Sequence, residues 1–130
     1  MTETEYVKNW FLRADDDLRS SKVLLDENGA PNVICFLTQQ VAEKCLKGFL
    51  AYQEKHTRKI HNLLILMEEC KKIEPSFGKL EDEARHLNQF YIETRYPGDY
   101  PEFTQKEAQK AYEIASKIRD FVVDKLSHSS

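Results

Sequence analysis

Apolar residues recur through most of this chain at the spacing of α-helices. Side chains three and four residues apart share one face of a helix, because one turn takes about 3.6 residues. Gly29 is expected to cap the first helix in the left-handed conformation, Pro31 to prevent that helix from continuing, and Pro75 to end the third. We therefore expect helices over 4–27, 32–55, a segment from 60 or 61 to before Pro75, 77–94 and 104–126.

These segments define the fold class. No stretch alternates between apolar and polar residues as a strand would, and no internal repeat is visible. A short turn between the first two helices makes them antiparallel neighbours. We expect an all-α, up-and-down bundle of four long helices plus a shorter fifth helix. A single domain should span residues 1–126, with a disordered tail at 127–130.

The second predicted helix is mostly apolar but carries one polar stripe, formed by Gln40, Glu43, Lys44 and Lys47. One interpretation is a solvated edge on which Glu43 and Lys47 form an i,i+4 ion pair. The other is one wall of a binding site. Gln40 lies where the helix has already turned inward, so its amide would need a partner there. The pattern leaves both interpretations open.

Composition narrows the class of protein. The 130 residues include 32% charged side chains and a net charge of only -3, which is typical of a soluble globular domain. A mildly acidic chain disfavours binding of long duplexes, although it permits contact with a nucleotide or a single RNA site. No apolar run approaches the roughly 20 residues that cross a bilayer. We expect a cytoplasmic protein that does not engage a membrane.

Residues that could hold a metal are poorly placed. Three successive aspartates, Asp15 to Asp17, point about 100° apart on a helix, so we expect a solvated face. His56 and His61 lack a further ligand at metal-binding spacing. Cys35, Cys45 and Cys70 lie in apolar patterns and should be reduced core residues. We expect no metal and no other cofactor.

His61 has two open interpretations. It stands where the third helix begins, and the free N–H groups of a first helical turn can hold an anion. It could equally cap that helix or pack beneath the basic segment 55–59.

Tyrosines surround a cation in the turn-rich segment after the fourth predicted helix. Tyr91, Arg95, Tyr96 and Tyr100 combine stackable rings with a fixed positive charge, which suits bases and phosphates. The alternative is a loop whose tyrosines simply pack onto the bundle.

In the last helix, Ile114 and Phe121 form a second apolar ridge beside the main core face. This ridge is interpreted either as a dimer surface or as core covered by a neighbouring helix.

Three segments resemble the HEPN (higher eukaryotes and prokaryotes nucleotide-binding) domain: FLTQQVAEKCLKGFLAY, KIHNLLILMEEC and YIETRYPGDYP. The resemblance extends over nearly the whole chain. It implies an all-α bundle that is commonly dimeric and often encoded beside a small nucleotidyltransferase in toxin–antitoxin-like pairs. The implied bundle agrees with the helical pattern.

Many members of that family are metal-independent ribonucleases in which an arginine precedes a histidine by four to six residues. Here Tyr100 stands where the histidine after Arg95 would be expected, while Arg58 is too close to His61. A tyrosine with a pKa near 10 is a poor base at neutral pH. The sequence therefore favours binding over catalysis and identifies no catalytic residue.

The resulting hypothesis is a non-catalytic HEPN-like domain that binds a nucleotide or RNA and acts with a nucleotidyltransferase, as a homodimer. The alternatives are a ribonuclease that brings Arg95 and His61 together in space, and a structural dimerisation adaptor. The expected ligand-binding residues are Gln40, Glu43, Lys44, Lys47, His61, Arg95, Tyr96 and Tyr100.

Overall fold

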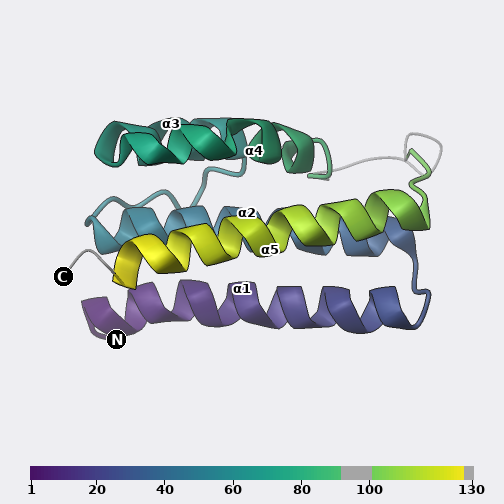
Figure 1. Cartoon of the computed structure of the whole chain (residues 1–130). Coiled ribbons are helices and arrows are strands. Elements are labelled where there is room, and N and C mark those ends of the chain that lie inside the picture. Colours follow the sequence, from purple (N-terminus) through teal and green to yellow (C-terminus); the bar gives the residue numbers. More distant parts are fainter. Residues whose placement is uncertain (92–100, 128–130) are drawn as a thin grey trace.

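The computed structural model describes residues 1–91 and 101–127 (Figure 1). Within these residues there is no strand, and the five α-helices confirm the predicted all-α bundle. The helical elements are α1 (Glu3–Asp26), α2 (Pro31–Tyr52), α3 (Leu63–Ile73), the 3₁₀ helix η1 (Pro75–Leu80), α4 (Glu81–Asn88) and α5 (Gln105–Ser127).

The helices form layers around α2. The long helices α1, α2 and α5 run along a common direction, and α3 and α4 lie over α2 and α5 on the side away from α1 (Figure 1). α2 packs against each of the other four α-helices. Its apolar side chains, such as Ile34, Val41 and Phe49, are almost completely buried. The helix α2 is thus the centre of the bundle.

The turn between α1 and α2 differs in one detail from the expectation. Asn28, with φ of 56°, takes the left-handed conformation that we expected of Gly29. Gly29 instead donates its N–H to the carbonyl of Leu24 at 2.6 Å, which satisfies the end of α1. Asparagine tolerates this conformation because its short polar side chain can bond locally. Pro31 then opens α2, one residue before the expected start at Asn32, because the first helical position does not need the N–H that proline lacks.

The third and fourth helices are shorter than the other three. Asn62 caps α3, which therefore begins at Leu63 rather than at 60 or 61. Pro75 ends α3 and opens η1, so the helix expected over 77–94 starts as a 3₁₀ turn and becomes α-helical only at Glu81. Residues 92–94 of that predicted helix lie outside the described residues.

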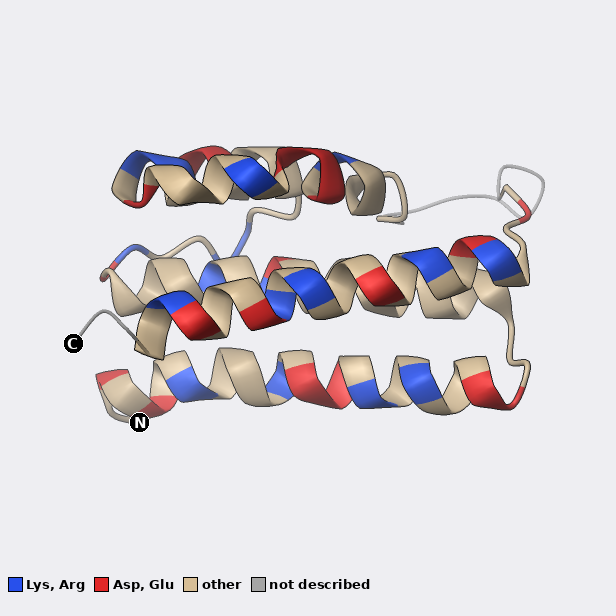
Figure 2. Cartoon of the chain, viewed as in Figure 1, with Lys and Arg blue, Asp and Glu red and all other residues tan. Residues whose placement is uncertain are grey.

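Ion pairs correct the expectation of a purely solvated aspartate face on α1. Asp15 binds Arg119 of α5 at 3.0 Å, and Asp17 binds Lys44 of α2 at 2.5 Å. Asp16 lies between Arg13 and Arg19 on α1 itself. Figure 2 shows charges of both signs interleaved along α1 and α5. The three carboxylates do diverge, as predicted, but two of them hold helices together.

The apolar ridge of α5 belongs to the core. Ile114 and Phe121 are partly buried and pack against the main cluster, and the Phe121 ring lies 5.1 Å from that of Phe77 in edge-to-face contact. Of the two interpretations, the structure therefore favours core. The interpretation of the chain as a dimerisation adaptor loses the surface on which it relied.

The three cysteines lie in the core. Cys35, Cys45 and Cys70 are free and buried, as predicted. Burial raises the pKa of the Cys35 thiol to about 11.

Ser127 belongs to α5 rather than to the expected tail, whose remaining residues, 128–130, lie outside the described part. Over the described residues, no helix combines the length and apolarity that crossing a membrane requires.

Candidate functional site

Three polar side chains follow one another along successive turns of α2. Gln39, Glu43 and Lys47 are spaced four residues apart, so they share one line on the helix. Gln39 Nε2 donates to Glu43 Oε1 at 3.2 Å, and Lys47 Nζ donates to Glu43 Oε2 at 3.0 Å. Glu43 is 4% exposed and Lys47 is 2% exposed. The predicted i,i+4 pair therefore exists, but it is buried rather than solvated.

The Lys47 ammonium has further partners outside α2. It donates to the backbone carbonyl of Arg58 at 2.9 Å and lies 5.5 Å from the ring centroid of Trp10 on α1. Removing an ammonium and a carboxylate from water costs several kcal/mol per ion unless hydrogen bonds compensate. These contacts supply the compensation and tie α2 to α1 and to the loop before α3.

His61 lies where this buried pair meets the surface. Its Nδ1 is 3.1 Å from Glu43 Oε2, and its side chain is 45% exposed. The imidazole stacks on the Tyr91 ring, with centroids 5.0 Å apart and planes at 10°. Since Glu43 occupies Nδ1, Nε2 is the ring nitrogen available to a ligand. We call Gln39, Glu43, Lys47, His61 and Tyr91 the α2–His61 network.

The backbone at the start of α3 does not form the anion site that the sequence suggested. Asn62 Oδ1 accepts from the N–H groups of Leu64 at 2.8 Å and Ile65 at 3.4 Å. Asn88 Oδ1 accepts from the N–H of Leu63 at 2.8 Å. These first-turn donors are occupied, so an anion beside His61 would have to be held by side chains.

The structure joins some of the predicted site residues and separates others. Glu43, Lys47 and His61 are in direct contact. Gln40 reaches them indirectly, because its Nε2 donates to Gln39 Oε1 at 2.7 Å. Lys44 is directed elsewhere, to Asp17 on α1. Three further predicted residues lie outside the described part of the chain: Arg95, Tyr96 and Tyr100.

Sequence reasoning missed Gln39 as part of this network. It is completely buried, and its amide also lies within 3.4 Å of the backbone carbonyl of His61. A signal for it was present in the sequence, because Gln39 stands one i,i+4 step before Glu43. The role of the Arg58 carbonyl had no such signal, since any residue type supplies one.

No metal site accompanies the network. Among residues 1–91 and 101–127, no group of three or more histidine, cysteine or acidic side chains could hold an ion. The network holds the half-exposed His61 imidazole in a fixed orientation. Its Nε2 is available to a ligand, and the Tyr91 ring lies against its face.

Comparison with known proteins gives consistent matches. The HEPN domain family matches residues 7–126 of the chain. The chain is 26% identical over 138 aligned positions to "Putative toxin MJ1304" of Methanocaldococcus jannaschii, covering 92% of this chain and 88% of that protein.

Two crystal structures share the fold. TT1696 from Thermus thermophilus superposes with a TM-score of 0.80 at 30% identity, covering 92% of this chain and 97% of that one. ST0689, described as an archaeal HEPN homologue, gives a TM-score of 0.70 at 25% identity, with coverage of 92% and 96%. Both superpositions include nearly the whole bundle.

Proposed function

The chain belongs to the HEPN domain family, and we propose that it binds a nucleotide or an RNA element without cleaving RNA. We further propose that it works with a small nucleotidyltransferase in a toxin–antitoxin-like pair, as a cytoplasmic homodimer. The toxin designation of the Methanocaldococcus relative supports the pairing, as does the resemblance of the three sequence segments to proteins encoded beside such enzymes.

The orientation of His61 is the observation that carries the binding proposal. Glu43 holds Nδ1 at 3.1 Å while the ring remains half-exposed against Tyr91. A buried Glu–Lys pair is a costly way to stabilise a helical bundle, since apolar residues of similar volume often do so equally well. Such a pair is better explained if it positions a group that acts at the surface.

The residues then divide by role. Glu43 and Lys47 are too buried to meet a ligand directly, and they act as positioning residues. His61 and Arg95 are proposed to meet phosphate, and Tyr96 and Tyr100 to stack on a base. Gln40 orders the network through Gln39. Lys44, which is engaged by Asp17, adds positive charge nearby rather than a defined contact.

Isothermal titration calorimetry with nucleoside triphosphates tests this function. The wild-type protein should give a saturable heat, and His61→Ala and Arg95→Ala should each weaken affinity about tenfold, which corresponds to about 1.4 kcal/mol. Arg85→Ala on the outer face of α4 is the matched control and should bind as the wild type does. Indistinguishable heats for the wild type and Arg95→Ala would remove the proposal.

A metal-independent ribonuclease is the second candidate, and the Glu43–His61 contact favours it. A carboxylate on Nδ1 can orient an imidazole whose Nε2 exchanges a proton with a ribose hydroxyl. Total RNA incubated with the protein in EDTA separates the two candidates. Cleavage that disappears in His61→Ala would establish the ribonuclease, while intact RNA at high protein concentration would exclude it.

A further inference from the structure

A surface groove lies beside the α2–His61 network. It runs between the first turns of α1 and the loop at 56–60, and its volume is about 690 Å³. Pockets for small ligands occupy roughly 300–1,000 Å³, so this groove could take a nucleotide-sized molecule. The side chains on which its chemistry depends are Glu3, Tyr6, His56, Thr57, Arg58 and Lys59.

Aromatic rings form one wall of the groove. Tyr6 and His56 meet edge to face, with centroids 5.6 Å apart and an interplanar angle of 65°. Tyr6 also contacts Trp10 at 6.1 Å, again edge to face. In an edge-to-face contact, the edge of one ring rests on a face of the other, so the ring that contributes its edge keeps both of its faces uncovered by its neighbour. A flat base can therefore stack on this wall.

Two cations of the groove lining stand on a tight turn. The Ile60 N–H donates to the Thr57 carbonyl at 2.9 Å, which places Arg58 and Lys59 at the two corner positions. Both side chains are exposed, and neither makes an ion pair with another residue of the described ranges. A phosphate would therefore meet two cations that no described residue neutralises.

Two further groups suit a ligand of this kind. Thr57 lines the groove, and its hydroxyl is buried with no hydrogen-bond partner among the described residues, so a side-chain rotation that exposed the hydroxyl would let it donate to a phosphate oxygen. Glu3 is the acidic side chain of the groove, and its carboxylate accepts hydrogen bonds, as the amino group of a base requires.

A hydrogen bond connects the groove to the α2–His61 network. Lys47 Nζ donates to the carbonyl of Arg58, so the buried ammonium fixes the turn that presents both cations. His61 follows the same turn directly in sequence. A ligand in the groove and a ligand at His61 would therefore contact opposite ends of one rigid loop.

We propose that this groove binds one nucleotide unit, with its base on the Tyr6–His56 wall and its phosphate at Arg58 and Lys59. The inference rests on the proposed function and specifies a second place where the nucleotide or RNA is held. Free nucleotides and single-stranded RNA offer the same base and phosphate chemistry.

Fluorescence anisotropy of 5′-fluorescein-labelled pentaadenylate, in EDTA and with the full chain, tests the groove. Tyr6→Leu and Arg58→Ala should each weaken binding about tenfold, because the first removes the aromatic ring on which the base stacks and the second removes a cation that meets the phosphate. Arg58→Ala keeps the backbone carbonyl that Lys47 uses, so the loop should retain its conformation. Tyr52→Leu and Arg85→Ala are the matched controls and should bind normally.

Competition with unlabelled ATP identifies the source of the nucleotide. Displacement of the probe supports a groove open to free nucleotides, and retention of the probe supports a groove that requires RNA. If Tyr6→Leu and Arg58→Ala bind the probe as the wild type does while His61→Ala binds it weakly, the proposal that the groove binds a nucleotide is overturned and the proposed function stands. If the wild type binds neither probe nor ATP, both are overturned.

Discussion

Lys47 illustrates how strongly a single buried side chain can be constrained. Its ammonium is nearly excluded from water and is bonded to Glu43 and to the Arg58 carbonyl. We predict that Lys47→Met lowers the free energy of unfolding by about 3–5 kcal/mol, because it leaves the Glu43 carboxylate buried with its ammonium removed. Urea denaturation measures the change. Lys72→Met, at an exposed ion pair, should cost no more than about 1 kcal/mol.

The double variant Glu43→Gln, Lys47→Met gives the sharper version of this test. With both charges removed, no unpaired ion remains, so the loss should be clearly smaller than the sum of the two single losses. Additive losses would show that the pair contributes no coupling energy.

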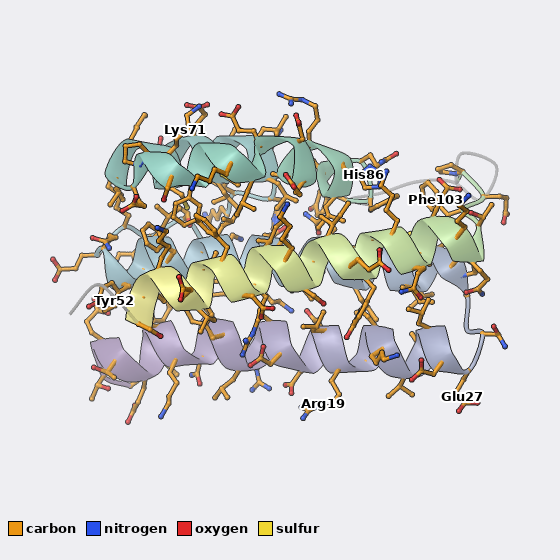
Figure 3. All side chains as sticks on the ribbon, in the orientation of Figure 1. Arg19, Glu27, Tyr52, Lys71, His86 and Phe103 are labelled. Carbon is orange, nitrogen blue, oxygen red and sulfur yellow. The ribbon has the colours of Figure 1, made fainter. Side chains whose placement is uncertain are left out.

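His86 gives a prediction about pH. It packs edge to face on Phe90, which contacts Phe103, at the end of the bundle where Figure 3 labels His86 and Phe103. Burial, assisted by the positive charge of Lys110, lowers the pKa of His86 below its ordinary value of 6.5. The unfolded chain therefore binds the proton more readily than the folded chain does.

The consequence is a loss of stability on acidification. The contribution of His86 is fully present above pH 6.5 and is lost as pH falls towards the lowered pKa of the folded state. We predict that His86→Gln flattens the pH dependence of the unfolding free energy in this range, relative to His56→Gln as control. An equal slope in wild type and His86→Gln would contradict the assignment.

The helices α1 and α2 pack closely where Gly48 of α2 meets the Phe11 ring of α1. A Cβ atom on Gly48 would lie 2.5 Å from the Phe11 ring, so the two helices approach through the missing side chain. We predict that Gly48→Ala destabilises the protein by about 1–3 kcal/mol through overpacking, despite the better helix propensity of alanine. Thermal denaturation should show partial recovery when Phe11→Leu is added.

Gly78 is the matched glycine for this comparison. A Cβ there would lie 3.5 Å from the Lys71 side chain, which is an ordinary contact distance. Gly78→Ala should therefore be tolerated. A similar loss at both glycines would contradict the role assigned to the Phe11 contact.

Helical periodicity predicted the elements well because each helix buries one continuous face. It could not predict that the fourth segment opens as a 3₁₀ turn, since that depends on how Pro75 and Phe77 pack against neighbouring helices. It also identified Gln40 rather than Gln39 as the buried amide. Both glutamines lie near the edge of the apolar face, and only contact with Glu43 and the His61 carbonyl distinguishes them.

For the whole molecule, α2 links the core to the candidate site. The same helix that packs against every other α-helix also carries Glu43 and Lys47, so the orientation of His61 depends on the integrity of the bundle. A change in the core that shifts α2 should therefore weaken ligand binding without touching the ligand. Under the proposed function, this coupling accounts for the polar residues at the centre of an otherwise apolar helix.

The central claim is that this HEPN-domain protein binds nucleotide or RNA and leaves RNA intact. It is tested most directly by following the anisotropy of a 5′-labelled single-stranded RNA of about twelve nucleotides over time in EDTA, a length that spans a typical single-strand binding site. We predict a rise when the protein is added, followed by a constant value. No rise would contradict binding, and a rise that decays to the value of a short fragment would contradict the absence of cleavage.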